Sequence, residues 1–522
     1  MKPSQFFRSP SPSPSPSFLM SPTLPGRLSR RAAVVLMRWL PLGLLAIAAM
    51  AAGTANAAPG GDEPPLPQPT RLLQLPALHQ QRLDNGLDLV VVQRSELPLI
   101  SLSLVVRAGA EADPPGRPGV AAMTSQLWPK GARRGGRAVT APELARQAEA
   151  LGGMLEARSS WGASLLTMTV TTPRAAEALG LMADVLRQPM LAADELERAR
   201  AQTLDALRVT LGNPADVAAL ALRRSFWGDV PHGRVAPPAA VQRLQRADLQ
   251  AFQARWVRPD RVALVLVGDL SAEQGRDMAQ RLLGDWRAPA ESAPELTLPA
   301  PRPLADTLVL IDLPGSGQSS VTVAAPFAAS QQPERVAALV ANAVLGGGYS
   351  ARLNQQVRIQ RGLSYGASSA VESFSGGGML SAQAQTSHAN AAQVLQLLRE
   401  QISAMATAPP SAEELAARQA ALIGSFGRRL ETTAGLSMLL VGQITSGRPL
   451  AELSNHVGAI LAVTPVQVQS YARQHWHGDA LRAVVVGDLG AAGAELAALA
   501  PKALRLTMAE LDLEQSGLRK PR

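Results

Sequence analysis

Apolar and polar positions follow two different periods along the chain. Continuous apolar runs over residues 87–92 and 100–106 predict two strands that we expect to pair as a hairpin. Three later segments are rich in alanine and place their apolar residues at helical spacing, which predicts helices over residues 142–151, 174–186 and 194–209. Strands followed by such helices favour a mixed α+β domain in which helices pack on a sheet.

The same pattern returns in the second half of the chain. Arg261–Leu270 recurs as Leu481–Leu489, with one Gly-Asp pair beginning at Gly268 and its copy at Gly487. This spacing is far longer than the period of solenoid repeats, so it indicates a duplicated domain. Five prolines within residues 288–303 predict a stiff, extended linker between the two copies.

Two predicted helices begin with the same local signature. Thr140-Ala-Pro-Glu143 and Ser411-Ala-Glu-Glu414 match the capping box, in which a hydroxyl and a carboxylate each accept from a backbone amide at a helix start. Each half therefore carries at least one well-marked helix start.

The repeats and the proline-rich segment divide the chain into six parts. We expect an N-terminal extension (1–57), a linker (58–80), an N-terminal domain (81–287), a proline-rich linker (288–303), a C-terminal domain (304–500) and a tail (501–522). Each half has the size of one ordinary domain. The predicted fold class is α+β, with two homologous α/β sandwich domains in tandem.

The segment 1–57 has the composition of an export signal. An apolar run over residues 40–52 follows Arg38 and leads to Ala55-Asn-Ala57, which predicts a signal peptide cleaved after Ala57 and a periplasmic protein. The run is shorter than the roughly 20 residues that span a bilayer, so we expect no stable membrane anchor. Met37 is an alternative start, and Arg30-Arg31 leaves the twin-arginine route open beside the general one.

Composition argues against disulfide bonds, a lipid anchor on cysteine and a nucleic-acid partner. The chain has no cysteine, which excludes disulfides and a lipid-anchored cysteine. Six of the nine excess positive charges fall in the segment 1–57, and the remaining three are spread over the rest of the chain. That charge forms no basic patch, so we expect no nucleic-acid partner.

The stretch Arg352-Leu-Asn-Gln-Gln-Val-Arg358-Ile-Gln-Arg-Gly-Leu-Ser-Tyr365 resembles a segment of the pitrilysin (insulinase, inverzincin) zinc peptidases. In that family an arginine and a tyrosine seven residues later contact the substrate opposite the metal. The resemblance covers residues 81–500 and implies the pitrilysin-type fold in each half. It also implies that Arg358 and Tyr365 contact substrate, and both side chains can donate to a carbonyl oxygen as it becomes an oxyanion.

The zinc motif of that family, H-x-x-E-H, aligns with a segment that lacks every metal-binding side chain. Ala122 and Gln126 stand at the two histidine positions, and Ser125 stands at the position of the general base. The segment that matches the third ligand, residues 202–207, contains no glutamate. Since a catalytic zinc needs three protein ligands, we expect no metal and no other cofactor in this chain.

Residues 362–366 fit a second, unrelated pattern. They read G-x-S-x-G, the nucleophile elbow of serine hydrolases, with Ser364 as the nucleophile. The elbow requires a buried strand before the serine and a helix after it. Here a helical pattern precedes Ser364 and a strand-like segment, residues 367–374, follows. We consider three hypotheses for the function of the chain, and an independent serine hydrolase at Ser364 is the third of them.

The first hypothesis is a non-catalytic subunit of a heterodimeric periplasmic zinc peptidase. An H-x-x-E-H subunit of the same family would hold the zinc, and Arg358 and Tyr365 would act in its active site. The substrate would be an extended peptide that adds a strand to an exposed sheet edge. The second hypothesis is an assembly scaffold, although a scaffold has no use for oxyanion donors.

Overall fold

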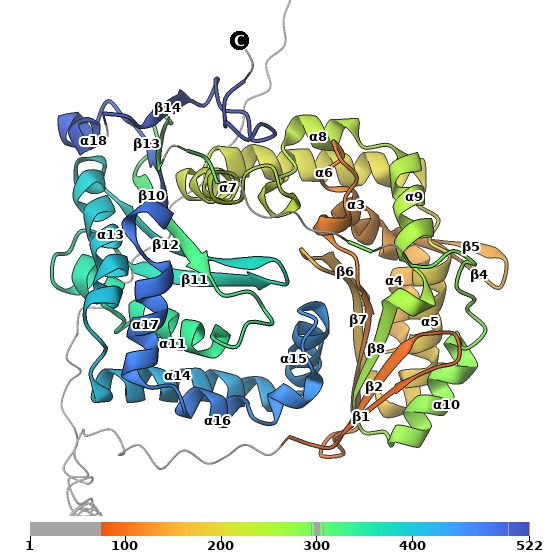
Figure 1. Ribbon diagram of the computed structural model, residues 1–522. Helices are drawn as coiled ribbons and strands as arrows, with labels where there is room; N and C mark the ends of the chain where they lie inside the picture. The colour runs from red at the N-terminus through yellow and green to blue at the C-terminus, as the bar shows by residue number, and fades with distance from the viewer. Residues whose placement is uncertain (1–74, 294, 297–302, 306, 500, 521–522) are drawn as a thin grey trace, which may run out of the picture. The chain divides into compact units, whose positions relative to one another are not determined.

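The computed structural model describes residues 75–293, 295–296, 303–305, 307–499 and 501–520 (Figure 1). The chain divides into two units, Met1–Pro69 and Thr70–Arg522, and all described residues belong to the second. The predicted signal peptide and cleavage site therefore lie outside the described residues. Within the described residues, no helix combines the length and the apolar character needed to cross a membrane.

The N-terminal half is built on a six-stranded sheet with the order β1-β2-β8-β3-β7-β6. Its strands are β1 (Leu78–Arg82), β2 (Asp88–Gln93), β3 (Leu99–Val106), β6 (Glu156–Ser159), β7 (Ser164–Thr171) and β8 (Val262–Gly268), and β4 (Gly131–Arg134) and β5 (Arg137–Thr140) form a separate pair. Its helices are α3 (Val120–Leu127), α4 (Ala141–Ala150), α5 (Ala175–Arg187), α6 (Ala193–Leu211), α7 (Pro214–Trp227), α8 (Pro238–Arg243), α9 (Arg246–Trp256) and α10 (Ala272–Leu283).

The C-terminal half has a second six-stranded sheet with the order β11-β12-β10-β13-β9-β14. Its strands are β9 (Leu308–Asp312), β10 (Ser319–Phe327), β11 (Ala367–Phe374), β12 (Gly377–Thr386), β13 (Arg482–Gly487) and β14 (Leu504–Thr507). Its helices are α11 (Arg335–Leu345), α12 (Arg352–Asn354), α13 (Ala391–Thr407), α14 (Ala412–Leu430), α15 (Thr433–Thr445), α16 (His456–Leu461), α17 (Pro465–His475) and α18 (Gly493–Leu499), with a π-helical turn, η6 (Gln355–Ile359), after α12.

The two halves repeat the same elements in the same order. Helices α6 and α14 begin at positions 193 and 412, α7 and α15 at 214 and 433, and α9 and α17 at 246 and 465, so one constant offset relates all three pairs. The central strand of each sheet, β8 or β13, comes from the end of its half. The α+β class and the duplication are confirmed.

The predicted hairpin of the first two strands is wrong. Strand β8 lies between β2 and β3, parallel to β2 and antiparallel to β3. Every residue of β8 is buried, because a strand at the middle of a sheet is covered on both faces. Strand β8 comes near the end of its half and is wholly apolar, so the position between β2 and β3 that buries it determines which strands pair. Nearness of β2 and β3 in the sequence does not.

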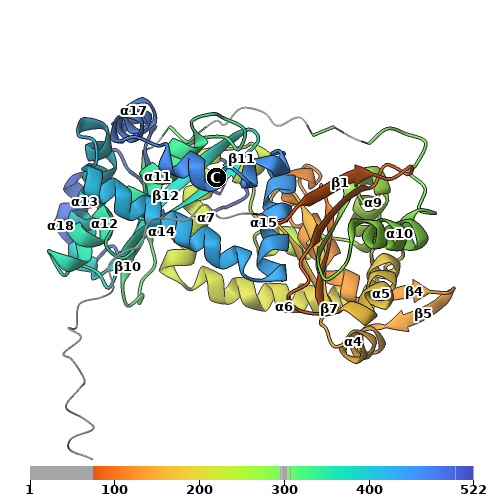
Figure 2. The same cartoon turned by 90° about the horizontal axis from the view of Figure 1, so that it is seen from below.

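Each half lends one helix to the sheet of the other half. Helix α7 packs on β10 and β13, and its counterpart α15 packs on β3 and β8 (Figure 1 and Figure 2). At the α15 contact, the Ser101 hydroxyl lies 2.9 Å from that of Thr433, and Ser103 lies 3.0 Å from Ser437. This exchange joins the two halves through buried apolar surface, which is the main source of stability in such contacts.

The folded part of the chain extends beyond the boundaries expected from the sequence. Strand β1 begins at Leu78, inside the predicted linker 58–80. Strand β14 pairs with β9, and Leu511, Leu513 and Leu518 are buried against the core that contains α7. The segment 501–520 is thus part of the C-terminal half and not a tail. Of the proline-rich linker, residues 294 and 297–302 lie outside the described residues.

Candidate functional site

Helix α3 carries the positions at which the resembling family binds zinc. Its start is held by Asp113, whose carboxylate accepts from the backbone N–H groups of Gly119 (2.6 Å) and Ala121 (2.7 Å). Burial raises the pKa of Asp113 to about 7, against the effect of these two donors. The start of the helix is therefore firmly held. The helix is well ordered, but its side chains offer no metal-binding group.

The three motif positions on α3 present no metal ligand. Ala122 is exposed and Gln126, one turn later, is half-buried, so the two share the open face of the helix. Ser125 is 1% exposed, and its hydroxyl donates to the backbone oxygen of Ala122 at 3.0 Å. Nowhere in the described residues do three or more His, Cys, Asp or Glu side chains gather to hold a metal ion. These residues do not fit a zinc ion.

Arg358 lies between two tyrosine rings on the other half of the molecule. Its guanidinium carbon is 4.9 Å from the ring centre of Tyr349 and 4.7 Å from that of Tyr365. Both rings are unusually open, with exposed fractions of 64% for Tyr349 and 89% for Tyr365. Both distances are within the range of cation–π attraction. We call Tyr349, Arg358 and Tyr365 the tyrosine clamp.

Tyr349 is the member of the clamp that motif reasoning missed. The chain has only three tyrosines, and two of them flank Arg358 closely in the sequence. This clustering of tyrosines around Arg358 is the sequence feature that could have identified Tyr349. Arg358 and Tyr365, which the resemblance to the peptidase family indicated, do lie together.

Local backbone geometry fixes the orientation of the clamp. Arg358 sits on η6, a π-helical turn, which is an uncommon conformation often found at functional sites. The chain then reverses at Gly362, whose φ of 61° favours glycine. The hydroxyl of Thr386 on β12 donates to the backbone oxygen of Leu363 at 2.5 Å and ties the turn to the sheet.

Arg352 anchors the start of this segment to helix α14. Its guanidinium donates to both carboxylate oxygens of Glu414, at 2.8 and 2.7 Å. The Ser411 hydroxyl accepts from the Glu414 backbone N–H, as the predicted capping box requires. The Glu414 carboxylate, however, points to Arg352 and not back to the helix start, so only half of that box forms. The diverted carboxylate supports the clamp segment.

Asn354 connects the two ends of the clamp segment. Its side-chain amide donates to the backbone oxygen of Tyr349 at 2.6 Å, and its side-chain oxygen accepts from the N–H of Ala367 at 3.2 Å. Ala367 is the first residue of the edge strand β11. The loop that carries Tyr349 is therefore fixed directly to that strand.

A groove of about 690 Å³ adjoins the clamp. It is lined by Gly346–Gly348, Tyr349, Tyr365, the start of β11 and the residues 383–385 of β12. A side chain at Gly346 would place a Cβ atom 2.5 Å from the backbone nitrogen of Ser369, so only glycine fits there. Strand β11 pairs only with β12 among the described strands. On its other edge, the backbone N–H groups of Ala367 and Ser369 donate to Asn354 and to the backbone oxygen of Gly346, so that edge is free of such partners only beyond Ser369.

Ser364 is not arranged as a nucleophile. Its hydroxyl donates to the backbone oxygen of Gly366 at 2.8 Å and accepts from the N–H of the same residue at 3.1 Å. A π-helical turn precedes the serine and strand β11 follows it, the reverse of the elbow order. The serine closes a local turn.

Comparisons with known proteins agree with this architecture. Residues 89–235 match the family model of insulinase (peptidase family M16), and residues 243–422 match the model of the peptidase M16 inactive domain. An uncharacterized zinc protease of Mycobacterium leprae is 27% identical over 282 residues, which cover 51% of this chain and 60% of that protein. A Mycobacterium bovis protein of the same description is 27% identical over 369 residues, 67% of this chain and 80% of its own length.

One solved structure has the same fold over most of the chain. The peptidase M16 inactive domain from Pseudomonas fluorescens aligns with a TM-score of 0.73 at 24% identity, covering 78% of this chain and 98% of that chain. The likeness extends over both halves of the described structure.

Proposed function

Because this chain belongs to the insulinase and pitrilysin family of peptidases, we propose that it is a non-catalytic, peptide-binding subunit that works with a zinc-bearing subunit of the same family. One contrast carries the proposal. The α3 face that would hold zinc offers Ala122 and Gln126, whereas Tyr349, Arg358 and Tyr365 remain assembled, with both rings exposed and Arg358 half-buried.

The clamp has hydrogen-bonding capacity that the chain itself does not use. In the described part of the chain, neither the Arg358 guanidinium nor the Tyr365 hydroxyl makes a hydrogen bond or ion pair. An exposed cation–π contact contributes only about 0.5–1 kcal/mol, so stability gives little reason to keep three such side chains together. Free donors of this kind suit a peptide carbonyl that gains negative charge during hydrolysis.

The proposed substrate is an extended peptide that lies along the open edge of β11. Beyond Ser369 the outer edge of β11 pairs with no described strand, and its backbone there can pair with a further strand. The groove beside Tyr349 and Tyr365 would receive side chains of that peptide. The proposed compartment is the periplasm, because the segment 1–57 has the pattern of a cleaved signal peptide.

Reconstitution with an H-x-x-E-H subunit tests the proposal. Peptide hydrolysis should appear on mixing, and Arg358→Ala or Tyr365→Phe should lower turnover by about 10²- to 10³-fold, the usual effect of losing one oxyanion donor. Subunit association and the zinc content of the complex should not change. Arg473→Ala removes an exposed arginine on α17, away from the clamp, and serves as the control.

The outcome separates the three hypotheses. Turnover within about twofold of wild type in both clamp variants would leave only the scaffold role, given the expected size of the donor effect. Labelling of Ser364 by a fluorophosphonate probe would support the serine hydrolase instead. We expect no labelling, since that hydroxyl is engaged with Gly366.

A further inference from the structure

A second cavity, of about 500 Å³, lies within the C-terminal half and shares no lining residue with the groove. Its walls come from α11, α14, α15 and α16, together with the short 3-10 turn η8 (Leu450–Leu453). This volume is typical of a small-molecule site.

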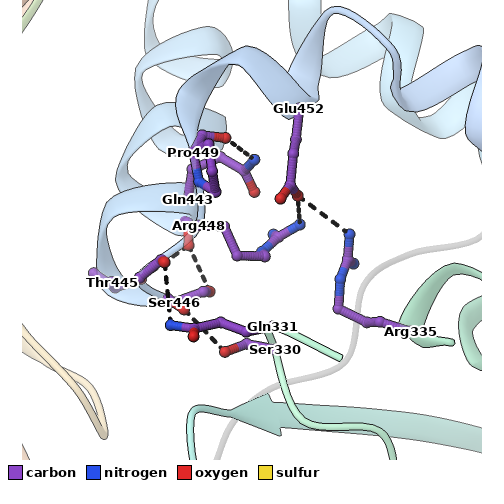
Figure 3. A network of polar contacts seen from close by, with 11 residues as sticks. Ser330, Gln331, Arg335, Gln443, Thr445, Ser446, Arg448, Pro449 and Glu452 are labelled. Carbon is purple, nitrogen blue, oxygen red and sulfur yellow. Dashed lines mark hydrogen bonds and ion pairs between the residues drawn. The ribbon is translucent and has the colours of Figure 1, made fainter. Parts of the chain in front are cut away.

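Positive charge dominates the lining of this cavity. Arg335, Arg429 and Arg448 line it with a single carboxylate, that of Glu452, which leaves a surplus of two positive charges. One oxygen of Glu452 faces both Arg448, at 3.5 Å, and Arg335, at 4.0 Å (Figure 3). His456 adds no charge near neutral pH, because burial and the three arginines lower its pKa to about 4.

Two of the arginines are buried without enough partners. Only 15% of the Arg335 side chain and 17% of the Arg448 side chain is exposed. Within the described residues, the Nε atom of Arg448 is buried without a hydrogen bond, and the Arg335 guanidinium has only its 4.0 Å contact with Glu452. Burying a charged donor without a partner is costly. A ligand that accepts these hydrogen bonds would remove that cost.

The loop that carries Arg448 is held in place before any ligand binds. The Ser330 hydroxyl donates to the backbone oxygen of Ser446 at 2.9 Å, and the Gln331 amide donates to that of Gly447 at 3.2 Å (Figure 3). The side chain of Arg448 therefore starts from a fixed backbone. Such preorganisation reduces the entropy lost on binding.

One part of the cavity wall is apolar, beside polar lining residues such as Gln331, Gln443 and Asn455. Leu339, Leu422, Phe426 and Met438 face the same space, and the Phe426 ring lies 4.5 Å from the ring of His456. A purely inorganic ion would leave this wall in contact with water. The wall therefore calls for a ligand with an apolar part.

We propose that this cavity, the anion pocket, binds a small organic anion whose carboxylate or phosphate group contacts Arg335 and Arg448 while its apolar body lies against Leu339, Phe426 and Met438. Arg429, which is exposed, stands at the mouth. The anion pocket does not depend on the proposed peptidase role, because its residues belong neither to the clamp nor to the groove.

Isothermal titration calorimetry on the purified full chain tests this proposal with four probes. Phenyl phosphate and phenylacetate carry both parts of the proposed ligand, inorganic phosphate lacks the apolar body, and benzyl alcohol lacks the charge. We expect saturable binding of at least one aromatic anion at one site per chain, at least about tenfold weaker binding of inorganic phosphate, and none of benzyl alcohol. The tighter of the two aromatic anions identifies the acidic group.

Two variants with opposite expected effects on anion affinity test the proposal further. Arg448→Gln should weaken binding of the better anion by about tenfold or more, whereas Glu452→Gln should tighten it several-fold by removing the competing carboxylate. Glu452 is 47% exposed, so its variant is expected to fold. Arg473→Gln, on the exposed side of α17, removes the same charge elsewhere and should have no effect.

Three results would overturn the proposal. These are no saturable binding of either aromatic anion up to about 10 mM, equal binding of inorganic phosphate and phenyl phosphate, and the same affinity in wild type, Arg448→Gln and Glu452→Gln.

Discussion

On α3 the face toward solvent holds Ala122 and Gln126, whereas around η6 it holds the exposed rings of Tyr349 and Tyr365. Arg358 lies half-buried between these rings. The first surface carries no side chain that could bind a metal or move a proton, yet its helix is well packed. The second keeps an arginine and two phenols that the fold itself barely uses. Under the proposed function, metal binding was lost while the means to contact a peptide persisted.

Side chains beneath the clamp make strong contacts, as Asp113 does beneath α3, whereas Gln126 on the face of α3 does not. The clamp segment rests on a bidentate ion pair between Arg352 and Glu414 and on the Asn354 bridge. Gln126 makes no comparable contact within the described residues. Disturbing the clamp from below should therefore cost more than changing the face of α3.

Arg352→Ala is the variant for which we expect the largest loss of stability. It leaves the partly buried Glu414 carboxylate without its cation, and charge-assisted hydrogen bonds contribute about 1.5–3 kcal/mol, so the free energy of unfolding should fall by about 2 kcal/mol. Urea denaturation measures this. The control Gln126→Ala should change it by less than about 0.5 kcal/mol. Equal effects in the two variants would contradict the difference in support.

Restoring histidines to α3 tests whether its geometry survives. Ala122→His with Gln126→His places two imidazoles one turn apart on the open face, enough for weak zinc binding. At a zinc concentration of about tenfold the dissociation constant, the variant should gain roughly 1.4 kcal/mol of stability by linkage. Wild type should gain none and should contain no stoichiometric zinc on purification. About one tightly held zinc per wild-type chain would refute this interpretation of α3.

Tyr349→Ala should have the smallest effect of the three. Losing one ring from an exposed cation–π contact costs about 0.5–1 kcal/mol, which corresponds to a two- to fivefold loss in peptide affinity if Arg358 is less well held. Tyr349→Phe keeps the ring and should bind like wild type. A loss in Tyr349→Phe as large as that in Tyr349→Ala would show that the hydroxyl, and not the ring, is what matters.

Features that depend on neighbours in sequence could be predicted, whereas those that depend on distant contacts could not. The main helices follow from local spacing and the duplication from a repeat in the sequence. The empty motif on α3 and the pairing of Arg358 with Tyr365 follow from the resemblance to the peptidase family. The insertion of β8 between β2 and β3 and the addition of β14 to the sheet depend on which strand is buried best. The exchange of α7 and α15 has no local signal, since an apolar helix does not specify which sheet covers it.

Side-chain roles at the site show the same division. Glu414 fits a capping box by sequence, and only the fold brings Arg352 close enough to take its carboxylate. Tyr349 belongs to no motif, and it becomes part of the clamp because Asn354 fixes its loop to β11.

The proposal that the clamp binds an extended peptide without a metal is tested most directly by equilibrium titration. A fluorescent extended peptide is titrated with the purified chain in the presence of EDTA. We expect binding that is independent of metal, about tenfold weaker in Arg358→Ala through the loss of a charged donor, and unchanged in Gln126→Ala. Binding that requires zinc, or that is the same in wild type and Arg358→Ala, would contradict the proposal.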